Sequence, residues 1–444
     1  MVQDLTVGKS SKVLLKFTLP LFISVCFQQF YSIADSLIAG HFAGEAALAA
    51  IGASHPVTNL FNAVAFGCNI GCSVVISQYF GAKKYGKVKT AGWTALISCG
   101  ILGLILTVFG VCLTPIIINA INTPQNIFAE SSAYLSIYIG GFTFLFLYNV
   151  ANGIFTSLGD SKTSLYFLMF SSVFNVVLDY VAVEVFDKGV IGIAWATFIA
   201  QGIAGIASVL TLLKRLRSLK TESKPELFSF EIFKRICRIS IPSVLQQSFV
   251  SVGNVFIQKI INSFGSSVIA GFSASMKLNT FTINALYTFG NGVSSFTAQN
   301  MGANKHSRIK EGMKYGSAMA IVTGCCFMVI YLLFNEQLIS LFMDSNSSAL
   351  AIKTGCDFLK IVSPFYCFIG IKLVGDGILR GMGAMRLFMV ATFTDLILRV
   401  VLSYALSPFM QETGVWVSWP VGWTVATIIS IAFYFRVVKN SQGS

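Results

Sequence analysis

Long apolar stretches, separated by short polar segments, recur along the whole chain. A helix that crosses a membrane needs roughly 20 predominantly apolar residues, and twelve stretches reach that length. The pattern therefore predicts an all-α polytopic membrane protein rather than a series of soluble domains. The expected spans are 13–38, 47–78, 91–117, 131–157, 163–186, 190–212, 238–263, 268–299, 315–342, 350–380, 387–409 and 414–436.

The composition agrees with this interpretation. Of the 444 residues, 55% are hydrophobic and only 11% are charged, whereas an ordinary soluble chain is about 25% charged. The first apolar stretch is too long for the core of a signal peptide, and no small-residue cleavage site follows it. Nearly all of the 10 cysteines fall in apolar stretches, where Cys packs as a small hydrophobe, so no disulfide framework is expected.

The net charge of +13 is distributed according to membrane topology. If the N-terminus is cytoplasmic, most Lys and Arg residues lie in the inner segments, and the outer loops hold only Lys188 and Lys353. This positive-inside bias predicts that both termini are cytoplasmic. The same distribution explains the positive net charge, so no nucleic-acid partner is expected. The short loops favour a bacterial plasma (inner) membrane.

The chain also contains an internal repeat. A shift of 221 residues aligns Gly44 with Gly265 and Gln78 with Gln299, and a shift of 222 aligns Pro20 with Pro242. Each half has six spans, so the two halves have the same orientation, which is a transporter architecture. We expect an N-lobe (1–212), a cytoplasmic linker (213–237) and a C-lobe (238–444) around a central cavity.

Charged residues inside the spans differ between the halves. The C-terminal half offers three local pairs at helical spacing, which lower the cost of insertion. Lys259 and Lys277 have no local partner at helical spacing. Three interpretations are open: their side chains extend to the membrane surface, they pair with groups on other helices, or they line the cavity and meet an anionic substrate. The three pairs are Asp357 with Lys360, Lys372 with Asp376, and Asp395 with Arg399.

The N-terminal spans contain Asp35 and Asp179, and the only basic residue within their expected bounds, Lys16, lies near the start of the first span. Each carboxylate has an oxygen-bearing neighbour one helical turn earlier, Tyr31 and Asn175 respectively. One interpretation is a protonated carboxyl that is hydrogen-bonded within the bundle. The other is a binding site for H⁺ or Na⁺, because carboxylate, amide and hydroxyl oxygens suit a hard cation. Pro20, in the same span as Asp35, either permits a bend or simply packs.

Several motifs together resemble the multidrug and toxic compound extrusion (MATE) transporters. They are "ADSLIAGHFAGEAALAAIGAS", "GCSVVISQYFGAKKYGK" and "GIFTSLGDSKTS", and the N-lobe carboxylates look closest to the DinF-like branch. The resemblance implies a cation-coupled exporter that alternates between outward- and inward-open V shapes. It also implies roles for individual positions: a coupling-ion cluster of Asp35, Asn175, Asp179 and Thr197, cavity positions Tyr31, Tyr134 and Asn152, and a bending proline, Pro20.

The predicted function is therefore Na⁺- or H⁺-coupled antiport of amphipathic, cationic or zwitterionic organic compounds by a monomer in the bilayer. No other cofactor is expected. Two alternatives remain: a flippase for an anionic lipid-linked oligosaccharide, which would use Lys259, Lys277 and Arg399, and a membrane receptor or scaffold. Enzymatic chemistry is not expected, because the three His residues are scattered along the chain. ATP-driven transport is not expected either, because no GxxxxGK[ST] motif occurs.

Overall fold

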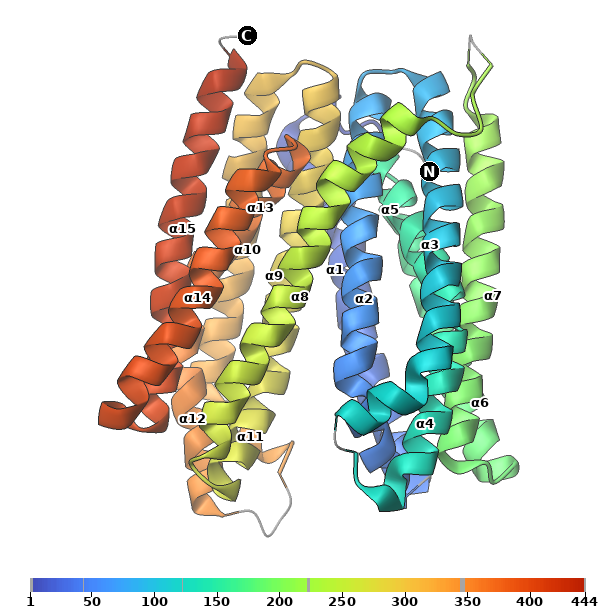
Figure 1. The fold of residues 1–444 in the computed structure, drawn as a ribbon. Helices are drawn as coiled ribbons and strands as arrows, with labels where there is room; N and C mark the ends of the chain where they lie inside the picture. The colour runs from blue at the N-terminus through green and yellow to red at the C-terminus, as the bar shows by residue number, and fades with distance from the viewer. Residues whose placement is uncertain (1–2, 43, 122, 222–223, 344–347, 443–444) are drawn as a thin grey trace. The chain divides into compact units, whose positions relative to one another are not determined.

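The structure, a computed structural model, describes residues 3–42, 44–121, 123–221, 224–343 and 348–442. The side chains of residues 34–37, 39–42, 44–48 and 126 lie outside this description. Throughout the described residues the regular structure is helical (Figure 1). The elements are α1 Ser10–Phe42, α2 Gly44–Gly81, α3 Tyr85–Ala120, α4 Gln125–Gly140, α5 Phe142–Ser157, α6 Ser161–Tyr180, η1 Val181–Val185, α7 Gly189–Ser218, α8 Phe230–Asn262, α9 Ser266–Gly302, α10 His306–Leu333, α11 Asn335–Ser340, α12 Ala349–Val362, η2 Ser363–Phe365, α13 Tyr366–Gly381, α14 Met385–Met410 and α15 Glu412–Gln442.

Within the described residues, nine helical segments are long and apolar enough to cross a membrane. The bent pair α4 and α5, which meet at an angle of 44°, makes a tenth. The helices α8 and α9 have 33 and 37 residues and are long enough, but they are more polar. Counting them gives the twelve spans that the sequence predicts.

The helices differ in three details from the expected elements. The helix α7 continues to Ser218 and α8 begins at Phe230, so only part of the expected linker 213–237 is non-helical. The expected span 315–342 ends early, because α10 stops at Leu333 and a separate short helix follows. The expected span 350–380 is interrupted by the 3₁₀ turn η2, which contains Pro364. A proline lacks the N–H that a continuous helix requires.

The backbone repeats the internal symmetry of the sequence. Lys83 and Asn304, which are 221 residues apart, both adopt a φ of 57° just after the second helix of their halves. Gly159 and Gly383, which are 224 residues apart, have φ values of 75° and 76°. A left-handed residue ends a helix by redirecting its last hydrogen bonds. Equivalent turns therefore close equivalent helices in the two halves.

The chain forms two compact units, and two helices belong to both. Unit 1 comprises Met1–Asp4 and Ile23–Gln247, and unit 2 comprises Leu5–Phe22 and Ser248–Ser444. The boundary within α1 falls two residues after Pro20, and the boundary within α8 falls five residues after Pro242. Both helices that pass between units therefore do so just after a proline.

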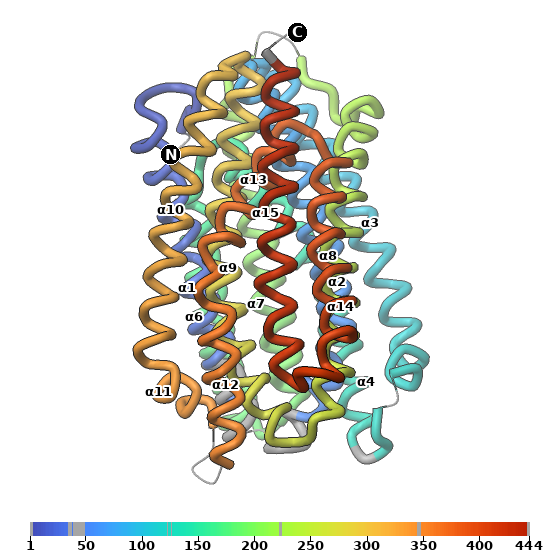
Figure 2. The backbone as a smooth tube through the Cα atoms, turned by 90° about the vertical axis from the view of Figure 1, so that its left-hand side faces the viewer, coloured from blue at the N-terminus to red at the C-terminus, as the bar shows by residue number. Residues whose placement is uncertain are grey.

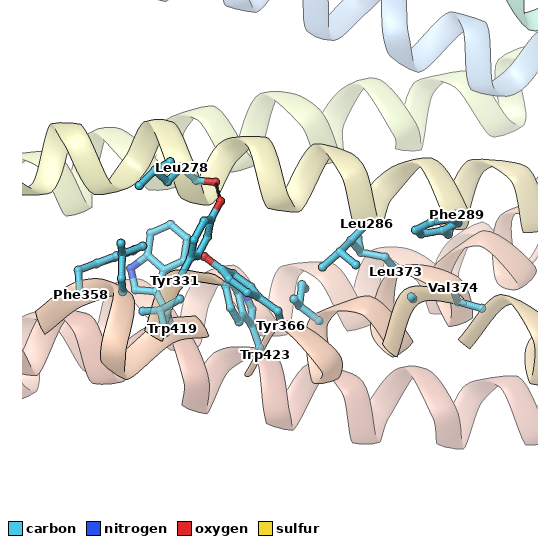
Figure 3. Packing of buried hydrophobic residues seen from close by; sticks show 14 of the residues in the cluster. Leu278, Leu286, Phe289, Tyr331, Phe358, Tyr366, Leu373, Val374, Trp419 and Trp423 are labelled. Atoms are coloured by element: carbon cyan, nitrogen blue, oxygen red, sulfur yellow. Dashed lines mark hydrogen bonds between the residues drawn. The ribbon is translucent and has the colours of Figure 1, made fainter. Parts of the chain in front are cut away.

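Aromatic side chains dominate the core of unit 2. Figure 3 shows Tyr331 and Tyr366 between α9 and the tryptophans of α15, with their rings 5.9 Å apart. The Tyr331 hydroxyl donates a hydrogen bond to the carbonyl oxygen of Leu278 at 2.9 Å. Figure 2 shows α14 beside α15, and these two helices pack closely along their lengths. This core fixes the positions of α9, α13 and α15.

Packing in unit 1 places α6 and α7 side by side and α5 against α2, α3 and α7. Close approach depends on small residues: at Gly153 of α5 a side chain would overlap Asn69 of α2. The rings of Phe61 and Phe142 meet edge to face with centroids 4.9 Å apart. The α6–α7 pair carries three of the four residues of the predicted coupling-ion site, Asn175, Asp179 and Thr197; the fourth, Asp35, lies on α1.

Candidate coupling-ion site

Asn175 and Asp179 lie one turn apart on α6, as their spacing predicts. Their exposed fractions are only 4% and 0%. The π-helical turn η1 begins two residues after Asp179. Such wide turns occur frequently at functional sites in membrane and soluble helices. A fully buried carboxylate beside an irregular turn is the central feature of this site.

Tyr31 of α1 connects a second helix to this pair. Its hydroxyl donates a hydrogen bond to Oδ1 of Asn175. The Nδ2 group of Asn175 is buried and has no hydrogen-bond partner among the described residues. Asp35 follows Tyr31 by one turn of α1, but its side chain lies outside the described part of the structure. Its position opposite Asp179 therefore stays a prediction.

Two further predicted residues flank the pair. Thr197 is buried on α7, the helix that packs against α6. Tyr134 of α4 belongs to a buried cluster with Val183 and Ile193, and Ile193 precedes Thr197 by one turn of α7. These contacts bring α4, α7 and the η1 turn that follows α6 together around the same region.

The remaining predicted positions are less closely tied to the site. Asn152 is partly exposed on α5, and its Oδ1 atom is buried without a hydrogen-bond partner among the described residues. Pro20 lies inside α1 and is buried. Its place near the boundary between the two units fits a bending position, and that role stays a prediction.

The donor set suits a proton or a hard cation. The predicted residues would supply the Asp179 carboxylate, the Asn175 amide and the Thr197 hydroxyl, all oxygen ligands of the kind that Na⁺ accepts. Among the described residues, no group of three or more His, Cys, Asp or Glu side chains is arranged to hold a metal ion. A tightly bound transition metal would need such a group, whereas a transported cation would not.

Two of the three predicted pairs in the C-terminal half are confirmed. Lys372 Nζ lies 2.7 Å from Asp376 Oδ2, and Arg399 Nε lies 3.2 Å from Asp395 Oδ1. The Ser430 hydroxyl donates a second hydrogen bond to Asp376 at 3.0 Å. All four charged side chains are buried. Pairing within one helix lowers the cost of burying each charge.

The third predicted pair is wrong. Asp357 and Lys360 form no ion pair with each other in the described structure; Asp357 is partly exposed and Lys360 exposed. Lys259 and Lys277 are also exposed, and Lys277 Nζ lies 5.2 Å from the centroid of the Phe342 ring. The expected uncompensated bases are thus surface groups of unit 2.

Sequence reasoning missed Arg380. It is the last residue of the expected span 350–380 and received no role there, but α13 extends to Gly381 and the Arg380 side chain is only 1% exposed. A signal was present, because Lys372, Asp376 and Arg380 follow one another at intervals of one turn. The first two side chains neutralise each other, and the third has no carboxylate within ion-pair distance among the described residues.

An ion pair also marks the start of α6, outside the membrane-spanning residues. Arg215 Nη2 lies 2.8 Å from Asp160 Oδ2, and Asp160 accepts the backbone N–H of Thr163 as the N-cap of α6. Burial raises the pKa of the Asp160 carboxyl, but hydrogen bonds such as that from Thr163 lower the pKa more, so its net shift is downward. Asp160 therefore stays ionised and anchors the helix that carries Asn175 and Asp179.

Comparison with known families agrees with this architecture. The family model described as MatE matches residues 20–181 and 242–405. The chain belongs to the MATE family of membrane transporters. The two matched segments of this MATE transporter begin at Pro20 and Pro242, the prolines that the internal repeat aligns.

Individual relatives cover almost the whole chain. The "Probable multidrug resistance protein YpnP" of Bacillus subtilis (strain 168) is 28% identical over 418 residues, which span 93% of this chain and 92% of the relative. A MOP superfamily transporter from Pyrococcus furiosus Vc1 (DSM3638) has a TM-score of 0.93 and 22% identity, covering 99% of this chain and 98% of that one. An outward-facing multidrug resistance MATE family transporter also has a TM-score of 0.93 and 22% identity, and the match covers 100% of this chain and 99% of that one.

These matches confirm the predicted family and fold class. The solved MATE structures have twelve transmembrane helices in two lobes. The transporter is accordingly an all-α, multi-pass membrane protein. The DinF-like branch, the lobe boundaries 1–212, 213–237 and 238–444, and the roles of the individual site residues stay predictions.

Proposed function

We propose that this chain is a cation-coupled antiporter that exports amphipathic organic compounds by alternating access. The observation that carries the proposal is the fully buried Asp179, one turn from an Asn175 that accepts a hydrogen bond from Tyr31. A carboxylate inside a membrane helix is costly and marks an ion pathway by default. Use in ion coupling would account for an acidic residue at this buried position.

The proposed cycle uses one event at Asp179. Binding of H⁺ or Na⁺ neutralises the carboxylate, changes the preferred packing of α1, α6 and α7, and favours release of cargo outward. Binding of cargo from the cytoplasm then favours release of the ion. Such exchange requires only that the two ligands favour different conformations. Movement of one charge through 100 mV supplies roughly 2.3 kcal/mol, enough to bias two conformations.

The names of the relatives support organic compounds as cargo. YpnP and several staphylococcal relatives named "Multidrug export protein MepA" carry names of drug resistance or export. We infer a plasma-membrane location with both termini cytoplasmic and a functional monomer, with small molecules and lipid as the only partners. A flippase for anionic lipid-linked sugars is not favoured, because Arg399, one of the bases it would use, is paired with Asp395.

Efflux from proteoliposomes tests the proposal. A fluorescent organic cation is trapped with the purified chain, and a Na⁺ gradient and a pH gradient are imposed separately. We expect one gradient to drive efflux, and we expect Asp35→Asn and Asp179→Asn to abolish it. Asp357→Asn is the matched control, because that carboxylate is partly exposed and forms no ion pair among the described residues. Efflux that neither gradient drives, or that survives both substitutions, would contradict the proposal.

A further inference from the structure

The fully exposed positions in the middle of α9 are polar. Between Gly271 and Asn300 the exposed residues of this helix are Ser273, Lys277, Thr280 and Asn284, and the partly exposed Tyr287 and Asn291 continue the same spacing. Intervals of three and four residues place all six side chains in one stripe.

This stripe cannot face lipid. No large hydrophobic residue of α9 is exposed, whereas the next helix, α10, exposes Val322, Val329 and Leu333. A helix surface in contact with lipid is apolar, because hydrocarbon offers polar groups no hydrogen bonds. The polar stripe of α9, defined by these six residues, therefore lines an aqueous path.

Arg380 lies behind one end of the polar stripe. Its Nη1 donates to the Tyr287 hydroxyl at 2.9 Å, and its Nη2 donates to Oδ1 of Asn291 at 3.1 Å. The Cζ atom of its guanidinium group also lies 5.2 Å from the centroid of the Tyr287 ring and 5.5 Å from the centroid of the Phe388 ring. No carboxylate balances it among the described residues, and its Nε has no hydrogen-bond partner there.

These contacts fix the direction in which Tyr287 and Asn291 can donate. A guanidinium group only donates hydrogen bonds. The Tyr287 oxygen is therefore an acceptor toward Arg380, and its own O–H is left to donate elsewhere. Asn291 presents Oδ1 to Arg380, so its Nδ2 group points away. Two donors one helical turn apart, both polarised by a buried positive charge, are thus available on a partly exposed surface.

We propose that Tyr287 and Asn291 bind the carboxylate of an amphipathic cargo molecule and that Arg380 is the positioning residue. The inference rests on the proposed export function and specifies one chemical group of its cargo. The polar stripe contains no acidic residue and includes Lys277. The only acid close to Arg380 along α13, Asp376, is neutralised by Lys372. The local charge therefore favours an anionic group over a cationic one.

A pair of dyes that differ by this one group tests the proposal. Rhodamine B carries a carboxylate, and its ethyl ester does not. Binding of each dye to the purified full-length chain is measured by fluorescence anisotropy. Loss of a hydrogen bond to a charged group weakens binding by about 10- to 100-fold. We expect this loss for rhodamine B in Tyr287→Phe and Asn291→Leu, and less than a twofold change for the ester.

Control variants separate recognition from folding. Tyr404→Phe removes a phenol from the exposed surface of α14 and should change neither affinity. Arg380→Gln should weaken rhodamine B selectively and Arg380→Lys should restore part of the difference, whereas damage to the fold would affect both dyes equally. If Arg380→Gln does not fold, the variants of Tyr287 and Asn291 still decide the question, because both side chains are partly exposed.

The outcomes distinguish this inference from the proposed function. Equal weakening of both dyes, or no weakening, in Tyr287→Phe and Asn291→Leu would overturn carboxylate recognition while leaving gradient-driven export intact. If the native chain neither binds nor exports either dye, then export of amphipathic compounds fails and the inference fails with it.

Discussion

The phenol of Tyr31 on α1 donates a hydrogen bond to the amide oxygen of Asn175 on α6. This contact joins the helix that carries Asp35 and Pro20 to the helix that carries the buried Asp179. Asp179 lies one turn after Asn175 on α6. A change in the charge of Asp179 would therefore affect the electrostatic surroundings of this hydrogen bond. The contact is therefore the most direct described connection between the predicted ion site and α1.

Replacing Tyr31 by Phe removes this hydrogen bond and keeps the ring. A neutral hydrogen bond contributes about 0.5–1.5 kcal/mol, so the concentration of coupling ion that gives half-maximal efflux should rise by about 2- to 10-fold. Ion titration of proteoliposome efflux measures this change. Tyr166→Phe is the control, because Tyr166 is exposed on α6. An unchanged ion dependence would show that Asn175 is positioned without Tyr31.

The Asp376→Asn substitution should destabilise the protein strongly. It leaves Lys372 buried without its partner, and breaking a buried pair in this way costs about 3–5 kcal/mol. Thermal unfolding in detergent, followed by tryptophan fluorescence, measures the effect. The double variant Lys372→Met/Asp376→Leu should recover most of the loss, because it removes both charges. If the single variant were as stable as the native chain, the pair would not be a structural ion pair.

Close packing of α9 against α13 depends on two glycines. A Cβ atom at Gly377 would overlap the carbonyl oxygen of Gly290, so Gly377→Ala must push the helices apart. Overpacking of this kind costs about 1–3 kcal/mol, and we expect a lower midpoint of thermal unfolding. Gly52→Ala is the matched control: no atom lies within 4 Å of its added methyl group, and alanine favours helix. Equal midpoints for the two variants would contradict the packing argument.

Stability should fall in acid partly through Asp160. Its pKa in the folded protein is lower than the ordinary value, which is about 3.9. Its contribution to stability is therefore complete above that ordinary value and is lost as the pH falls through the lower folded value. Unfolding midpoints measured from pH 6 to pH 3 should show a smaller acid-induced decrease in Asp160→Asn than in the native chain. Parallel curves would show that Asp160 contributes no pH-dependent stability.

Local spacing allowed the sequence to predict much of this structure. The pairs Lys372–Asp376 and Asp395–Arg399 form as expected, because a helix brings residues four apart onto one face. Asn175 and Asp179 lie one turn apart for the same reason. The sequence did not predict that Asn175 would accept its hydrogen bond from Tyr31, because that contact depends on how two distant helices pack.

Helix ends were the weakest part of the sequence prediction. Polar residues at the end of an apolar stretch resemble loop residues, and for this reason Arg380, the last residue of the expected span 350–380, was given no role inside the membrane helix. Its burial depends on Tyr287 and Asn291, which lie on another helix about 90 residues away and cannot be identified from local pattern. The polar stripe of α9 went unnoticed for a related reason: exposure of one face becomes visible only when the packing of the other faces is known.

The boundaries of the two units have a consequence for how the chain assembles. Residues 5–22 begin the first helix of the N-terminal half and pack in unit 2, where Thr18 meets Gly292 and Phe22 stacks on Phe289. The first part of α8 begins the C-terminal half and packs in unit 1, against Gly67 and Gly71.

Each half therefore contributes the start of its first helix to the other unit. The arrangement resembles the reciprocal arm exchange of a domain-swapped dimer, within one continuous polypeptide. A chain cut in the segment between α7 and α8 would yield two fragments, and each would lack a segment that completes its unit. The two fragments should regain the native structure only when they are made together.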